Sequence, residues 1–156
     1  GLIAFANNPK NESELWAVDP RGNLYRSSNG GNSWSDITEG LRDYQGSSSF
    51  GFIFFDSRAG VLYHGSKHGV LSSRDGGYVW SRIELTLAPE LLPASAMSVD
   101  PDNSLRMYIG VQNLLYVSED GGVTWTSVQI PGTGVISKIM PNPTNTREVF
   151  IGCSGK

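Results

Sequence analysis

Short apolar runs alternate with polar, glycine-rich stretches along the whole chain, a pattern typical of β-strands joined by tight turns. The longest apolar cluster, residues 50–55, is expected to form a buried strand. The chain holds 19 glycines and 8 prolines, and only 17% of its residues are charged, which favours many strands and turns over helices. The pattern therefore predicts an all-β chain.

One eight-residue sequence occurs three times, at residues 27–34, 73–80 and 118–125. Its clearest copy reads Ser118-Glu119-Asp120-Gly121-Gly122-Val123-Thr124-Trp125. From Ser27 to Ser73 is 46 positions and from Ser73 to Ser118 is 45, a spacing typical of repeated four-stranded units. Aspartate accepts hydrogen bonds from backbone N–H groups further along a turn, and glycine supplies positive φ, so each copy is expected to join two antiparallel strands.

A turn that begins with Asn or Asp occurs four times, at residues 8–11, 56–59, 100–103 and 142–145. Proline follows in three of the four and fixes φ for the reversal; the second turn is divergent, with Ala59 in place of Asn. An aromatic residue recurs on the strand after each turn, and a glycine follows it in three units, as expected where neighbouring units approach closely. These residues are Trp16, Tyr63, Tyr108 and Phe150, with Gly65, Gly110 and Gly152.

The two repeats together predict three complete four-stranded units, at residues 1–47, 48–95 and 96–134, and half a unit at 135–156. Four strands per unit at this interval favour the blades of a β-propeller over a sandwich. Propellers typically close with four to eight blades. We therefore expect a segment of a larger propeller, for which seven blades is one option, or a ring completed by other chain segments. The motif tryptophans are expected to wedge between neighbouring units.

The eight-residue sequence resembles the Asp-box, or BNR, repeat, whose consensus is Ser-x-Asp-x-Gly-x-Thr-Trp. Val79 replaces the consensus Thr in the second copy, and Asn29 and Ser33 replace Asp and Thr in the first, where weaker, uncharged hydrogen bonds are expected. The resemblance implies a propeller in which these residues are structural and peripheral. The structural set is Ser27, Asn29, Gly31, Trp34, Ser73, Asp75, Gly77, Trp80, Ser118, Asp120, Gly122, Thr124 and Trp125.

Composition and charge exclude several classes of function. The net charge of −3 and the pI near 5.3 leave no basic field for a nucleic acid. No run approaches eighteen apolar residues, so no membrane span is expected, and no signal peptide is recognisable. The lone Cys153 cannot form an internal disulfide and is expected to be a buried free thiol on a strand. We expect neither a cofactor nor a metal.

Two connections between units, residues 38–49 and 84–95, are longer than the third. In a propeller, these connections share one face with the loops between second and third strands, and that face usually carries binding. The candidate ligand-binding residues on it are Arg42, Asp43, Tyr44, Lys67, His68 and Glu90, and the same face is expected to carry Arg21, Gln45, Gln112 and Asn113. Asp43 and Glu90 could serve as acid and base on a glycosidic bond, which needs two carboxyls roughly 5–10 Å apart; solvated loop positions are the alternative and the favoured reading.

The Asp-box family includes sialidases, xyloglucan-acting glycoside hydrolases, sortilin-type receptors and photosystem assembly factors, more often secreted, lumenal or periplasmic. The expected first strands of the units are almost free of acidic residues, which favours a non-catalytic module that binds a protein, peptide or glycan. Part of a glycoside hydrolase propeller is the second reading, and a purely structural segment the third. Further blades, from the same chain or a second one, are expected partners.

Overall fold

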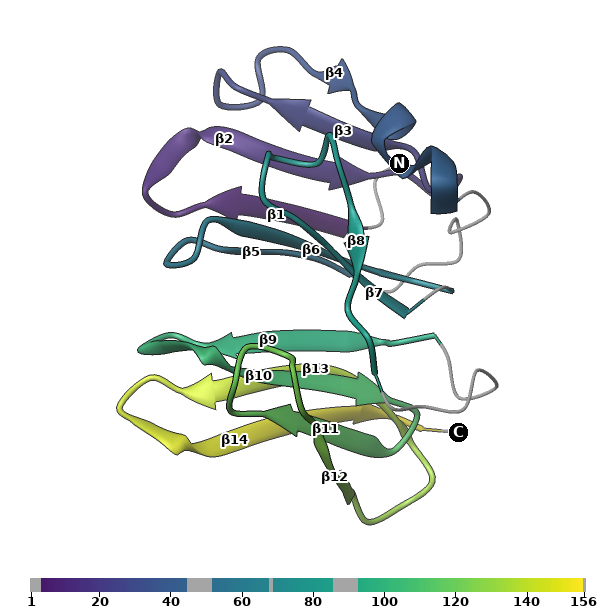
Figure 1. Ribbon diagram of the computed structural model, residues 1–156, viewed down its shortest axis with the longest axis vertical. Helices are drawn as coiled ribbons and strands as arrows, with labels where there is room; N and C mark the ends of the chain where they lie inside the picture. The colour runs from purple at the N-terminus through teal and green to yellow at the C-terminus, as the bar shows by residue number, and fades with distance from the viewer. Residues whose placement is uncertain (1–3, 45–51, 68, 86–92, 156) are drawn as a thin grey trace. The chain divides into compact units, whose positions relative to one another are not determined.

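The computed structural model describes residues 4–44, 52–67, 69–85 and 93–155. It divides into two compact units, Gly1–Arg82 (unit 1) and Ile83–Lys156 (unit 2), and antiparallel sheets make up each of them (Figure 1). The all-β fold with four-stranded antiparallel sheets is confirmed. Within the described residues, no helix has the length and apolar character needed to cross a membrane.

Unit 1 contains two four-stranded sheets, each with its strands in chain order. The first sheet is made of β1 (Ala4–Asn8), β2 (Asn11–Val18), β3 (Leu24–Ser27) and β4 (Ser35–Asp36). The second is made of β5 (Ile53–Asp56), β6 (Val61–Ser66), β7 (Gly69–Ser73) and β8 (Ser81–Arg82). The first strands of the two sheets, β1 and β5, lie side by side.

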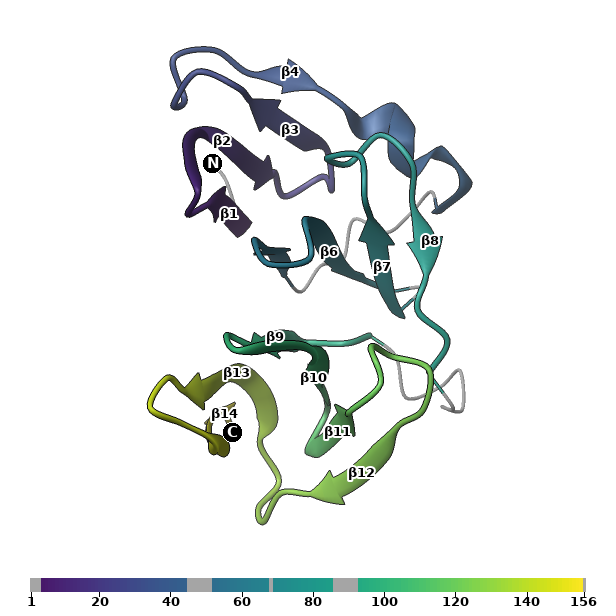
Figure 2. The ribbon, with the colours of Figure 1, turned by 60° about the vertical axis from the view of Figure 1, so that its left-hand side comes forward.

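Unit 2 contains one four-stranded sheet and one two-stranded sheet (Figure 2). The strands of the larger sheet are β9 (Ala96–Asp100), β10 (Asn103–Val111), β11 (Leu114–Ser118) and β12 (Thr126–Gln129). The smaller sheet pairs β13 (Val135–Asn142) with β14 (Asn145–Ser154). Here too the first strands, β9 and β13, are neighbours. The blade boundaries drawn from the sequence stay a prediction.

The repeated eight-residue sequence forms the same hydrogen-bonded turn in all three copies, which we call the Ser–Trp turn. In the third copy, the Ser118 Oγ accepts the Gly122 N–H at 2.8 Å and donates to Asp120 at 2.8 Å. The Asp120 Oδ1 accepts the N–H groups of Val123 and Thr124 at 3.1 and 2.8 Å. In the first copy, the neutral Asn29 Oδ1 accepts the Ser33 N–H at 2.9 Å. The sequence prediction of a turn organised by Asp or Asn is confirmed.

The tryptophan of each Ser–Trp turn closes its own turn, because its Nε1–H donates to the carbonyl of the second glycine at 2.9–3.1 Å. Trp80 is also buried in the core that both sheets of unit 1 share. Trp34, however, is 38% exposed. The expected wedge between units is therefore wrong for Trp34, whose turn lies uncovered within the described part of unit 1.

The four Asn or Asp turns also form as predicted. In each, the first side chain accepts the N–H two residues later, at 2.8–3.0 Å: Asn8, Asp56, Asp100 and Asn142. The glycine on the second strand of unit 2 marks a close approach, because a Cβ on Gly110 would lie 2.6 Å from the Ile136 Cγ2 on the neighbouring sheet. The turns therefore join the first two strands of each sheet, and the glycine lets the two sheets of unit 2 approach closely.

Two details differ from the sequence expectations. The segment expected as an irregular connection after the first sheet begins with a 3₁₀ helix, η1 (Thr38–Tyr44), whose Leu41 is buried in the unit 1 core. The predicted burial of Cys153 is wrong: it lies on β14 as expected but is exposed. The reason is that β14 pairs only with β13 among the described residues, so no further strand covers that part of it.

Candidate functional site

The four candidate ligand-binding residues that the structure describes belong to unit 1 and lie where its second and fourth strands end. These strands run in the same direction in an antiparallel sheet, so the loops that follow them leave from the same end. Arg42, Asp43 and Tyr44 lie on η1, after β4, and Lys67 lies exposed in the turn between β6 and β7. His68, Glu90 and Gln45 lie outside the described residues. That the six candidate side chains form one binding site stays a prediction.

The helix η1 holds its three candidates in different environments. The Asp36 Oδ1 accepts the Thr38 N–H at 2.9 Å and caps the start of η1. Arg42 is paired with Glu39 at 2.8 Å, and both side chains are mostly exposed. Tyr44 is half-buried against the unit 1 core, so part of its ring serves packing. Asp43 is exposed, and its proposed acid–base partner lies outside the described residues.

In unit 2, Gln112 and Asn113 lie at the corresponding end of the larger sheet, and both form hydrogen bonds with backbone groups. Gln112 has φ of 52°, and its carbonyl accepts the Ile136 N–H at 2.7 Å. The Asn113 carbonyl accepts the Ile130 N–H at 2.8 Å, and its side-chain Nδ2 donates to the Gly132 carbonyl at 3.2 Å. These bonds hold the connection between the two sheets of unit 2, which is a structural role.

A groove of about 510 Å³ in unit 2 was not predicted from the sequence. It lies between the larger sheet and β14, and it combines apolar side chains with charged ones. Its lining residues are Arg106, Tyr108, Leu115, Val117, Glu119, Arg147 and Val149. We call this cavity the groove throughout.

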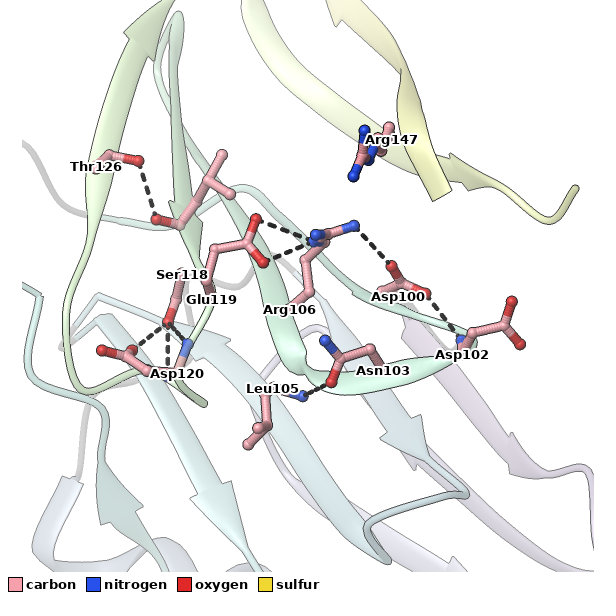
Figure 3. A network of polar contacts seen from close by, with 12 residues as sticks. Asp100, Asp102, Asn103, Leu105, Arg106, Ser118, Glu119, Asp120, Thr126 and Arg147 are labelled. Carbon is pink, nitrogen blue, oxygen red and sulfur yellow. Dashed lines mark hydrogen bonds and ion pairs between the residues drawn. The ribbon is translucent and has the colours of Figure 1, made fainter. Parts of the chain in front are cut away.

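Arg106 lies between two carboxylates beside the groove (Figure 3). Its Nε donates to both Glu119 oxygens at 2.8 and 3.0 Å, and its Nη1 lies 3.4 Å from the Asp100 Oδ2. The hydrogen bonds that Arg106 donates to Glu119 raise the pKa of the Arg106 guanidinium, which stays charged. Asp100 also accepts the Asp102 N–H of its own turn at 2.8 Å. Both carboxylates are thus engaged by Arg106, and Asp100 also by its own turn, so this network fits a structural clamp.

The sequence did contain a signal for the network. In the first sheet, Glu14 on β2 pairs with Arg26 on β3 at 2.5 Å. Arg106 occupies the position of Glu14 in the repeat, counted from the turn before the strand, with Glu119 close to the position of Arg26. The charges are reversed between the two sheets, so comparing copies of the repeat position by position would have revealed the pair.

His64 is buried on β6, and its ring lies edge-on to Trp80 with the centroids 6.0 Å apart. Burial lowers the pKa of His64, which outweighs the opposing effect of the Phe52 carbonyl 3.1 Å from its Nδ1. It is therefore a neutral core residue. Among the described residues, no group of three His, Cys, Asp or Glu side chains could hold a metal ion.

No protein-family model matches the chain. A xyloglucanase of Hypocrea jecorina is similar in sequence, with 29% identity over 160 residues, which covers 89% of this chain and 19% of the xyloglucanase. The GH74 enzyme of Niastella koreensis has a similar structure, with a TM-score of 0.75 and 19% identity over 98% of this chain and 26% of the enzyme. YCF48 bound to D1 peptide is also similar, with a TM-score of 0.69 and 19% identity over 92% of this chain and 45% of YCF48.

These likenesses establish the fold. The chain is a partial β-propeller with four-stranded antiparallel blades, and it spans about a fifth of the xyloglucanase and a quarter of the GH74 enzyme. Proteins of this fold include both glycoside hydrolases and a peptide-bound propeller. The fold alone does not separate catalysis from binding.

Proposed function

We propose that the chain belongs to a non-catalytic β-propeller module that binds a protein, peptide or glycan through the loops after its second and fourth strands. We also assign its Ser–Trp turns to the Asp-box repeat. The observation that carries the proposal is the position and the hydrogen bonding of the acidic residues on the first strands. In the described part of these strands, the acids are Asp56 and Asp100, each at a strand end, and each accepts a backbone N–H of its own turn.

The module reading agrees with the peptide-bound state of YCF48, which has this fold. The exposed Asp43 and Lys67 and the partly exposed Tyr44 supply the charged and aromatic groups that such a surface needs. An extracellular or periplasmic location is part of the proposal and rests on the same family resemblance.

A second candidate is part of a xyloglucan-acting glycoside hydrolase, which the 29% identity with a xyloglucanase favours. In that case, Asp43 and Glu90 are the pair to examine. The separation of their carboxyl groups would then indicate a retaining or an inverting reaction.

An assay with xyloglucan distinguishes the binding module from the glycoside hydrolase. The purified chain is incubated with the polysaccharide while reducing ends are measured, and binding is followed by affinity electrophoresis. We expect no release of reducing ends. Turnover that is lost in Asp43→Asn or Glu90→Gln, but kept in the control Glu12→Gln, would overturn the non-catalytic reading. Glu12 is a suitable control because it is exposed near the start of β2, at the other end of the sheet from η1.

The loop surface is tested with peptides selected on the chain from a random phage-displayed library. We expect Arg42→Ala with Asp43→Ala to weaken binding of the selected peptides about tenfold, while Glu12→Ala leaves it unchanged. Equal binding by the Arg42/Asp43 double variant and the Glu12→Ala variant would show that η1 is not part of the recognition surface.

A further inference from the structure

The first Ser–Trp turn contains the one Asn-Gly pair of the sequence, Asn29-Gly30, at the place where the other two copies have Asp-Gly. Asparagine is a thermolabile residue, and a following glycine, which has no side chain, leaves the asparagine open to attack by the next backbone nitrogen. The Asn29 side chain is exposed, so water reaches it. Asp75 is exposed as well, although the first sheet contacts its turn through Trp16, so this exposure belongs to the turn itself.

The reaction of such a pair is deamidation. The Gly30 nitrogen gives up its proton to water and attacks the Asn29 Cγ. A C–N bond forms, the bond from Cγ to Nδ2 breaks, and the amide takes up a proton and leaves as ammonia. Water then opens the resulting succinimide ring, at Cγ to give aspartate or at the backbone carbonyl to give isoaspartate. One water is consumed and one ammonia is released, so the residues themselves supply the chemistry.

The folded turn engages each group that the first step must free. The Gly30 N–H donates to the Ser13 carbonyl at 3.0 Å, which holds the proton that has to leave. The Asn29 Oδ1 accepts the Ser27 hydroxyl and the Ser33 N–H, both at 2.9 Å. The Asn29 Nδ2, the leaving group, donates to the Ser33 Oγ at 2.8 Å. Ring closure must therefore wait for a local opening of the turn.

The same turn already has the arrangement that an aspartate needs. In the third copy, Asp120 accepts the Ser118 hydroxyl (Figure 3) and both the N–H and the hydroxyl of Thr124. The first copy differs in one bond, because the Asn29 amide donates to the Ser33 Oγ where Asp120 accepts from Thr124. Rotation of the Ser33 hydroxyl reverses that bond. The hydrogen bonds from the Thr124 hydroxyl and N–H lower the pKa of Asp120 to about 2, so this turn favours a carboxylate.

Isoaspartate does not fit the turn in this way. It carries the backbone through the side-chain carbon and so adds one methylene between residues 28 and 30. The Ser27 Oγ accepts the Gly31 N–H at 2.9 Å, a bond that depends on the ordinary length of the chain between them. The two products of the reaction therefore differ in their effect on the turn.

We propose that Asn29 is a site of spontaneous deamidation, that the folded turn protects it, and that the aspartate product converts the first Ser–Trp turn to the charged form of the other two copies. The modification adds one negative charge to a chain of net charge −3. Asn32, in the same turn, is the internal comparison, because the side chain of the following Ser33 hinders ring closure.

The first test compares the reaction in the folded and the unfolded chain. The chain is incubated in mildly alkaline buffer with or without guanidinium chloride, and mass spectrometry of the tryptic peptide 27–42 follows both asparagines. Asn29 should react at least about tenfold faster in the unfolded chain, and faster there than Asn32. Equal rates in the two states, no reaction of Asn29 in guanidinium chloride, or equal reaction of Asn29 and Asn32 would overturn the proposal.

A variant of the turn tests the protection. Ser33→Ala removes the acceptor of the leaving amide and should raise the folded-state rate about fivefold, the factor for one typical hydrogen bond. Ser28→Ala, at an exposed serine of the same turn, is the control and should leave that rate unchanged. Circular dichroism checks that both variants fold, and the rates in guanidinium chloride correct for the change of sequence. Equal corrected rates in the two variants would show that the turn does not protect Asn29.

The product is tested directly by Asn29→Asp. Its unfolding temperature at neutral pH should lie about 1–4 °C above that of the parent chain, because charged hydrogen bonds replace neutral ones. Asn32→Asp makes the same change of charge in the same turn and should give no increase. Deamidated chain that contains isoaspartate, separated by ion exchange, should unfold at a lower temperature. An Asn29→Asp variant no more stable than the parent would overturn the assignment of the product.

Discussion

Ile37 in unit 1 and Val128 in unit 2 both stand three residues after the tryptophan of a Ser–Trp turn. Ile37 is 5% exposed and Val128 is 55% exposed. In unit 1, the turn of a second four-stranded sheet covers this position, whereas the second sheet of unit 2 has two strands. The comparison teaches that a repeat closes its own turn but depends on its neighbour for the burial of its outer strands.

The largest expected effect is at the aromatic position of the second strand. Trp16→Ala should lower the free energy of unfolding by about 3–5 kcal/mol, because Trp16 is fully buried, stacked and hydrogen-bonded. Phe150→Ala, at the matching position of the two-stranded sheet, should cost less than about 0.5 kcal/mol, since the side chain is 57% exposed. Urea denaturation measures both free energies of unfolding. Similar losses in the two variants would contradict the view that burial of this position depends on a neighbouring sheet.

Close contact between the sheets of unit 2 gives the next effect. Gly110→Ala should destabilise the chain by about 1–3 kcal/mol, because its Cβ would lie 2.6 Å from the Ile136 Cγ2 and 2.9 Å from the Ile136 Cβ. Gly152→Ala is the matched control, with its nearest atom 3.3 Å away. In a double-mutant cycle, Ile136→Ala should reduce the cost of Gly110→Ala, and strictly additive losses would argue against the contact.

The buried histidine of unit 1 predicts a pH dependence. Burial lowers the pKa of His64 below its ordinary value of 6.5, so the unfolded chain takes up a proton that the folded chain refuses. Stability should therefore fall as pH drops below about 6.5, by at most about 1.4 kcal/mol per pH unit, the limit for one linked proton, until the folded pKa is passed. His64→Phe should flatten this part of the profile. An unchanged slope would show that other groups cause it.

The smallest expected effect compares two Ser–Trp turns. Ser73→Ala removes the hydroxyl that donates to Asp75 at 2.7 Å and accepts the Gly77 N–H at 2.9 Å, and should cost about 1 kcal/mol. Ser27→Ala removes the same hydroxyl beside the neutral Asn29, in a turn that lies more exposed, and should cost less. Thermal unfolding of the two variants ranks them, and the reverse order would contradict the view that cover by a neighbour strengthens the turn.

Local interactions explain why so much of the fold could be predicted. The side-chain hydrogen bonds that shape a Ser–Trp turn join residues at most four positions apart, so much of its cause lies in the sequence of the turn itself. Its first glycine also donates to the second strand, as Gly121 does to the Leu105 carbonyl at 2.8 Å. The same holds for the Asn and Asp turns, where the bond spans two positions. The helix η1 also had local signals, the capping Asp36 and the buried Leu41, which the sequence analysis did not use.

Burial depends on distant neighbours, and there the sequence predictions were weaker. Cys153 lies in an apolar strand pattern and is nevertheless exposed, because the described residues contain no third strand beside β14. The groove draws its walls from strands about 40 positions apart along the chain, such as those carrying Arg106 and Arg147. No single motif marks it. The predicted loop residues stay a hypothesis, since their grouping depends on loops of which part lies outside the described residues.

The indole rings that fasten the turns are unevenly shared between the two halves of the molecule. Trp16, Trp34 and Trp80 lie in unit 1, and Trp125 is the only tryptophan of unit 2. A chain in which the first three are changed to phenylalanine would emit from Trp125 alone. Its emission spectrum and its quenching by acrylamide would then report on the surroundings of Trp125 in unit 2, free of any signal from unit 1.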